Sequence, residues 1–167
     1  KNMIKKQKSI LFLGLIRNLE YFYRNIEIAL SLRDSSLIDN IYCVSWKSDA
    51  EKNLKEINFL EKNNIIFKIE KDLEDNAILE GKNGSGMKVL HSISVGLGLY
   101  QKNQNIFKTR YDLLLTEEIL SKILGTDLSY KTKESYFSSK LLVPGAHLSK
   151  PYFFIDWFYY SDLLTLK

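Results

Sequence analysis

Short apolar runs alternate with longer segments of helical spacing, and this alternation restricts the chain to few folds. Apolar runs of strand length occur at residues 9–16, 41–45, 65–69 and 106–110. Segments with apolar residues every three or four positions separate them, at residues 19–32, 49–63 and 87–100. This repeated order predicts right-handed crossovers and a mainly parallel sheet. We therefore expect one α/β domain over residues 1–167.

Single residues and short segments of this pattern give further expectations about helix ends, helix packing and the C-terminal elements. Asp49 is expected to be the N-cap of the segment 49–63, because Asp accepts hydrogen bonds from backbone N–H groups at a helix start. Gly96 and Gly98 lie within a helical pattern and are expected to let that helix approach the sheet closely. A short helix is predicted at residues 117–124. Three short pieces follow, at residues 136–137, 140–143 and 152–155.

Composition restricts the compartment and the partners. The single cysteine, Cys43, cannot form an internal disulfide, which favours a reducing compartment and so the cytoplasm. No run reaches the roughly 18 to 20 apolar residues that span a bilayer. The net charge of +4 and pI near 9.0 suit anionic ligands or peripheral contact with the inner membrane.

Arginine is rare in this basic chain, at four of the 24 Lys and Arg positions. Its planar guanidinium can donate two hydrogen bonds to one phosphate or carboxylate group, whereas lysine is used widely for solubility. Arg17 follows the first predicted strand and Arg110 ends the fourth. In open sheets of this kind the ligand lies beyond the carboxyl ends of the strands. Both arginines are therefore candidates for ligand contact.

Four stretches fall at that edge of the sheet: residues 14–18, 45–49, 71–86 and 109–112. The third is long, polar and rich in glycine, so we expect it to close over a bound ligand. It does not match a phosphate-binding loop, because Met87 stands where the lysine belongs. His91 and His147 have no Cys or carboxylate at zinc-ligand spacing, and each is more simply a packed or surface residue.

Arg110 and Asp112 form the most informative pair. A carboxylate at a strand end can hold Mg²⁺ or Mn²⁺, which would neutralise a diphosphate leaving group, while the arginine binds phosphate. An ordinary salt bridge at the end of a strand explains the same residues equally well.

The sequence resembles the WavE-type bacterial lipopolysaccharide-synthesis glycosyltransferases. The resemblance rests on Lys108-Thr-Arg-Tyr-Asp112, on Phe12-Leu-Gly-Leu-Ile-Arg-Asn18 about a hundred residues earlier, and on a later Asp156-Trp-Phe158 element. It implies a Rossmann-like GT-A type fold that binds a nucleotide sugar. Arg110 replaces the first acid of the Asp-x-Asp element common in nucleotide-sugar enzymes, which leaves a metal site with one carboxylate, Asp112.

The resemblance also implies roles for single residues. A first nucleotide-contacting loop would consist of Gly14, Arg17 and Asn18. The base or ribose would meet Trp46 and Asp49, and the diphosphate would face Arg110 and Asp112. Near the acceptor, Asp156 would act as general base and Trp157 would stack on a sugar ring. Core or rim packing explains the two tryptophans as well, and a helix cap explains Asp156.

These roles predict transfer of a sugar from a nucleotide diphosphate sugar to a hydroxyl of a lipopolysaccharide or capsule precursor, which can be lipid-linked. The chain ends soon after Asp156, so we expect part of the acceptor-binding half to be missing. A non-catalytic nucleotide- or glycan-binding domain is the alternative. Nucleic acid is disfavoured as a partner, because the lysines are spread along the chain and no RNA-binding signature occurs.

Overall fold

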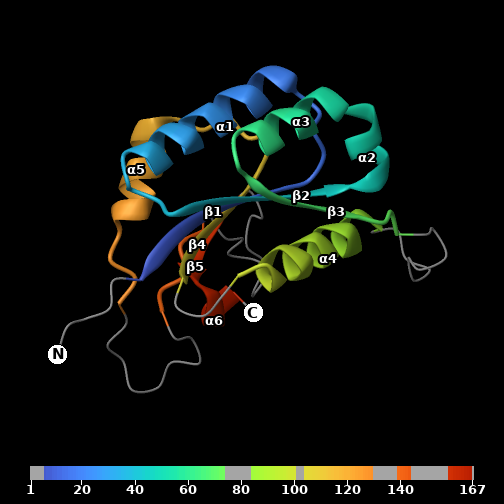
Figure 1. Cartoon of the computed structure of the whole chain (residues 1–167). Helices are drawn as coiled ribbons and strands as arrows, with labels where there is room; N and C mark the ends of the chain where they lie inside the picture. The colour runs from blue at the N-terminus through green and yellow to red at the C-terminus, as the bar shows by residue number, and fades with distance from the viewer. Residues whose placement is uncertain (1–5, 74–83, 101–103, 130–138, 144–157, 167) are drawn as a thin grey trace.

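The structure is a computed structural model, and it describes residues 6–73, 84–100, 104–129, 139–143 and 158–166 (Figure 1). These residues form an α/β fold with a five-stranded mixed sheet and six helices. The strands are β1 (Gln7–Leu13), β2 (Asn40–Trp46), β3 (Ile66–Glu70), β4 (Gln104–Arg110) and β5 (Tyr159–Asp162). The helices are α1 (Leu19–Asp34), α2 (Lys47–Lys52), α3 (Leu54–Lys62), α4 (Gly84–Gly98), α5 (Glu117–Gly125) and α6 (Leu163–Leu166).

The strand order is β3-β2-β1-β4-β5. The first four strands are parallel, and β5 runs antiparallel to β4. Leu13 at the end of β1 pairs with Arg110 at the end of β4, so both strands finish at the same level. The α/β class and the mainly parallel sheet predicted from the sequence are confirmed, and the strand order is compatible with a Rossmann-like fold.

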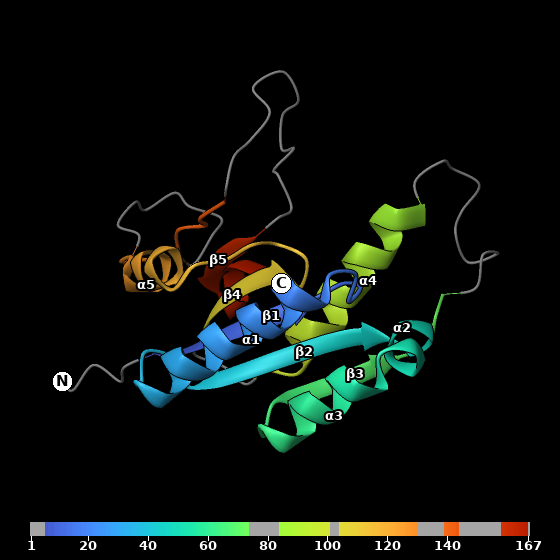
Figure 2. The same cartoon turned by 90° about the horizontal axis from the view of Figure 1, so that it is seen from above.

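Helices cover both faces of the sheet (Figures 1 and 2). On one face α1, α3 and α5 pack on the larger core, whose fully buried members include Phe12 and Phe22. On the other face α4 and α6 pack on a smaller core around Leu11, Leu97 and Ile106. Because strand side chains alternate between faces, the apolar runs of β1 and β2 supply both cores at once.

The larger core also encloses Cys43 in strand β2, which is almost fully buried. Burial raises the pKa of its thiol to about 12, because the thiolate loses its hydration. Cys43 thus packs as a small apolar residue of the core. In the described part of the chain, no helix is both long enough and apolar enough to cross a membrane.

Several sequence-based expectations were wrong in detail. The segment 49–63 is two helices, α2 and α3, which meet at Asn53. The first begins at Lys47, directly after β2, so Asp49 lies inside α2 and is not its N-cap.

The helix predicted at residues 117–124 is confirmed as α5, and of residues 140–143 only Leu142 pairs, through an isolated bridge. The pieces at residues 136–137 and 152–155 lie outside the described residues.

Gly96 and Gly98, near the end of α4, differ in their surroundings. A Cβ on Gly96 would lie 2.7 Å from Leu11 Cδ2, so this glycine does allow the helix to approach β1 closely. A Cβ on Gly98 would have nothing within 4 Å, so the prediction of a close approach there was wrong. The close contact explains how one helix can cover the centre of this face.

Candidate functional site

The direction of winding reverses between β1 and β4. The chain leaves β1 through α1 on one face of the sheet and reaches β4 from α4 on the other face (Figure 1). The strand order also reverses here, because β2 and β3 lie on one side of β1 and β4 lies on the other. Such a reversal is the topological switch point, and open α/β sheets bind ligands there, beyond the carboxyl ends of the strands. The turns after β1 and β4 therefore form the candidate site.

The turn after β1 is short and sharply bent. Gly14 has φ +101°, a conformation that residues with a Cβ rarely adopt. The backbone N–H of Arg17 donates to the carbonyl of Leu15 at 3.1 Å. Asn18 is the N-cap of α1, and its Oδ1 accepts from the N–H of Tyr21 at 3.1 Å. The exposed Arg17 side chain therefore starts next to the positive end of a sixteen-residue helix.

Asp49 holds this turn from the neighbouring helix α2. Its Oδ2 accepts from the backbone N–H of Ile16 at 2.9 Å, and its side chain is buried. Burial raises the pKa of Asp49, while the Ile16 N–H and the charges of Lys52 and Arg17 act in the opposite direction. Asp49 is thus at the predicted edge, but in this structure it supports the backbone of the turn.

The turn after β4 carries the predicted Arg110–Asp112 pair. Arg110 Nε donates to Asp112 Oδ1 at 2.8 Å and Arg110 Nη2 donates to Oδ2 at 2.7 Å, a two-point contact. These bonds lower the pKa of Asp112 against the effect of burial, and the charge of Arg17 lowers it further. The charges of Arg17, Arg110 and Asp112 therefore interact at the switch point, and Asp49 adds a second carboxylate that interacts with Arg17.

Two buried residues that sequence reasoning missed support this second turn. Asn25 of α1 forms hydrogen bonds with the backbone of Tyr111, Leu113 and Leu115. The Tyr111 ring stacks on Phe12, with 5.8 Å between centroids, and its hydroxyl lies 3.3 Å from Ser45 Oγ. A sequence signal existed for Asn25, because it is a polar residue at an apolar position of the helical pattern.

Trp46 lies in a second cluster at the same edge. It is the last residue of β2, is 7% exposed, and stacks on the imidazole of His91 in α4 with 5.6 Å between centroids. His91 Nε2 is 3.8 Å from Glu70 Oε2, and Lys68 Nζ is 2.9 Å from Glu70 Oε1. These contacts lower the pKa of Glu70, chiefly through Lys68. The Trp46 ring is therefore buried at this edge, and the half-buried imidazole of His91 is the more accessible of the two rings.

A divalent cation fits poorly among the described residues of the site. Both oxygens of Asp112 are engaged by Arg110, and no group of three or more His, Cys, Asp or Glu side chains suited to a metal occurs in the described ranges. Hard cations such as Mg²⁺ need several oxygen ligands. One carboxylate already paired with a guanidinium does not supply them.

Three predicted features lie outside the described residues: Asp156, Trp157 and most of the predicted closing segment, residues 74–83. The structure brings together the other predicted residues at one edge of the sheet. Gly14, Arg17, Asn18, Arg110 and Asp112 lie at the switch point, Asp49 lies beneath it, and Trp46 lies in the neighbouring cluster.

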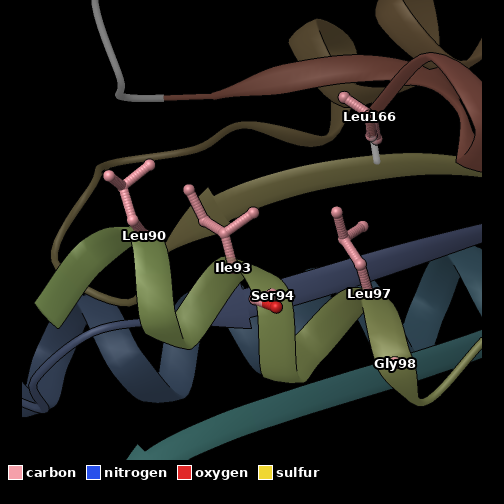
Figure 3. A pocket seen from close by; sticks show the side chains of 6 residues that line it. All are labelled: Leu90, Ile93, Ser94, Leu97, Gly98 and Leu166. Carbon is pink, nitrogen blue, oxygen red and sulfur yellow. The ribbon is translucent and has the colours of Figure 1, made fainter. Parts of the chain in front are cut away.

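An apolar groove lies away from this edge, between α4 and α6 (Figure 3). It has a volume of about 440 Å³ and is lined by Leu90, Ile93, Ser94, Leu97, Gly98 and Leu166. The residues that line it carry no charged side chain, in contrast to the switch point.

No model of a known protein family and no curated protein matches this chain. The residues of the two turns are therefore the basis for assigning a function.

Proposed function

We propose that this chain is the nucleotide-sugar-binding domain of a glycosyltransferase, with a GT-A type fold and membership of the WavE-type group. In this proposal it transfers a sugar to a hydroxyl of a lipopolysaccharide or capsule precursor in the cytoplasm, at the inner-membrane surface. The observation that carries the proposal is the meeting of Arg17 with the Arg110–Asp112 pair at the switch point of the sheet.

A diphosphate is the ligand chemistry that these groups favour. The start of α1 offers positive charge from its backbone N–H groups, and Arg17 follows the sharp turn at Gly14 directly. Arginine binds phosphate oxygens at two points. Arg110 is already oriented by Asp112, so its guanidinium is held in one direction before any ligand arrives. Such preorganised charge stabilises a leaving group as its negative charge develops.

In the proposed reaction the bond between the sugar carbon and the diphosphate breaks, and the acceptor oxygen forms a new bond to that carbon. The negative charge that develops on the diphosphate is stabilised by Arg17 and Arg110. Asp112 orients Arg110, and Asp156 is the proposed general base that takes the acceptor proton. We assign Arg110 the charge-neutralising role that a metal would otherwise fill, because Asp112 is engaged with it.

Thermal-shift measurements with uridine, guanosine, adenosine and cytidine diphosphates, with and without Mn²⁺, test the proposal. A ligand that binds the native state raises its stability in proportion to the logarithm of ligand concentration. We expect one diphosphate to raise the melting temperature more than the matching nucleoside does, and to do so without Mn²⁺. Equal shifts for the nucleoside and its diphosphate would remove the phosphate from the model.

The second candidate is a non-catalytic nucleotide- or glycan-binding domain. The engagement of Asp112 by Arg110 favours it, because that carboxylate then has no obvious chemical step to perform. Turnover of a panel of nucleotide sugars separates the two functions. A binding domain would show affinity for a nucleotide sugar with neither hydrolysis nor transfer.

A further inference from the structure

The turn that carries Asp112 is fastened to helix α1 by one buried side chain. Asn25 has no exposed surface. Its Nδ2 donates to the carbonyls of Tyr111 at 3.1 Å and Leu113 at 2.6 Å, and its Oδ1 accepts from the N–H of Leu115 at 3.2 Å. One amide thus uses both of its donor hydrogens and its acceptor oxygen on backbone groups of the same turn.

The same helix begins at the other turn of the site. Asn18, which caps α1, directly follows Arg17, and Asn25 comes seven residues later. A helix rises 1.5 Å per residue, so the cap and Asn25 are separated by about 10 Å of a rigid element. Helix α1 therefore connects the turn after β1 to the turn after β4, with Asn25 as the point of attachment.

Nothing in helix formation or core packing calls for asparagine at this position. Its neighbours on the buried side of α1 are apolar: Phe22, Ile26 and Ala29. Asn is a weaker helix former than Leu or Ala, and a buried amide is costly unless it is hydrogen-bonded. The three hydrogen bonds to the turn offset the cost of burying the amide. The contacts with the turn therefore explain why this position is asparagine.

We propose that Asn25 is a positioning residue: it fixes the turn of residues 111–115 to α1, and so holds the Arg110–Asp112 pair at the right place relative to Arg17. In this inference, only the choice of a nucleoside diphosphate as the ligand rests on the proposed function. The attachment itself is a property of the unliganded chain.

Asn25→Leu tests the inference, with Gln104→Leu as the matched control. Gln104 is also a buried amide, but it lies at the opposite end of β4, where it bonds Gln7 and Ser9. Hydrogen exchange of the amides at residues 111–115 and dissociation constants for the four nucleoside diphosphates are measured in both variants. Global unfolding is measured in urea and subtracted.

We expect the Leu115 amide to exchange at least about tenfold faster in Asn25→Leu than in Gln104→Leu, because its acceptor is gone. The affinity for the diphosphate that wild type binds should fall about tenfold in Asn25→Leu alone. If Asn25→Leu does not fold, Asn25→Asp is compared with Gln104→Glu. Asp keeps the acceptor for Leu115 but removes both donors to Tyr111 and Leu113, so exchange is then compared over the whole turn of residues 111–115 and not at Leu115 alone.

Equal corrected exchange in the two variants would overturn the attachment. Faster exchange with unchanged affinity would overturn the positioning role in binding. A wild-type chain that binds none of the four diphosphates would overturn the proposed function instead, and the exchange rates would still decide whether Asn25 holds the turn.

Discussion

The turn after β1 and the turn after β4 lie side by side at one edge of the sheet, but different kinds of contact hold them. The first is held by a charged group, the buried carboxylate of Asp49, which binds one backbone N–H. The second is held by the neutral amide of Asn25, which binds three backbone groups, and by the packed ring of Tyr111.

The two turns differ both in the groups that hold their backbone and in the charged side chains that they present. Protonation can change the support of the first turn but not that of the second, because an amide does not titrate. The charged side chains of the candidate site are distributed in the opposite way. The first turn presents Arg17 without a carboxylate in the same turn, whereas the second presents Arg110 already bonded to Asp112. Single substitutions can therefore be directed at one turn at a time.

The largest effect is expected from Asp112→Ala. Without the carboxylate, Arg110 loses its orientation, and transfer should fall by about 10²-fold or more. The fold should remain intact, because Asn25 binds the backbone of this turn rather than the Asp112 side chain. Turnover of nucleotide sugars and circular dichroism provide the two measurements.

Glu118→Ala is the control for that variant, since Glu118 is an exposed carboxylate of α5 that pairs with Lys122. It should leave turnover unchanged. Activity of Asp112→Ala within about twofold of wild type would contradict the proposed site.

Arg17→Lys and Arg110→Lys should each weaken nucleotide binding by about 1 to 3 kcal/mol, although the charge is kept, because the two-point contact is lost. Arg110→Lys should be the more damaging, since it also breaks the two bonds to Asp112. Calorimetry with the diphosphate that wild type binds gives the values. Arg24→Lys, on the exposed side of α1, is the control, and dissociation constants equal to it would exclude a phosphate role for both arginines.

Gly14→Ala tests the backbone of the first turn alone. Nothing within 4 Å would touch the new methyl group, so the cost is the positive φ, about 1 to 2 kcal/mol of unfolding free energy. Gly98→Ala is matched to it, because its surroundings are equally open and its φ is not positive. Urea unfolding should show a loss only for Gly14→Ala. Equal stabilities would mean that the turn does not need a glycine.

The smallest effects are expected in the pH dependence of stability. The pKa of Asp112 is lowered from 3.8 in the folded chain, so its contribution is present above that value and is lost as pH falls. The pKa of Asp49 is raised from 3.8, so stability declines as pH rises from that value through the folded pKa. The two carboxylates thus give opposite slopes.

Replacing each carboxylate by Asn allows the two opposite pH dependences of stability to be measured. Relative to wild type, Asp49→Asn should gain stability as pH rises from about 3 to about 7, whereas Asp112→Asn should lose it. Urea unfolding at several pH values gives both differences. Slopes of the same sign would show that the two turns do not differ as described.

The strands and the edge of the site were predictable because they depend on local pattern. Continuous apolar runs indicated buried parallel strands, and the carboxyl-edge rule then selected the two turns. The first run was predicted too long, because Gly14 bends the chain just after Leu13. Leu19 and Leu54 fit the helical spacing of the segments 19–32 and 49–63 but are exposed, since each lies at the first position of its helix.

The support of the site was not predictable in the same way. The bond from Ile16 to Asp49 joins residues 33 apart, and the bonds from Asn25 to the second turn join residues 86 or more apart. No local pattern encodes such pairs. A lone Asn on an apolar helix face indicates that a partner exists but does not identify it.

The buried thiol of Cys43 can be used to detect opening of the central sheet. An alkylating reagent attacks thiolates, and this thiol is both enclosed and kept protonated in the folded chain. Labelling would therefore proceed only through molecules whose central sheet has come apart. One cysteine placed on the surface of each turn could carry a dye without competition from Cys43, and the distance between the two dyes across the switch point could then be followed in solution.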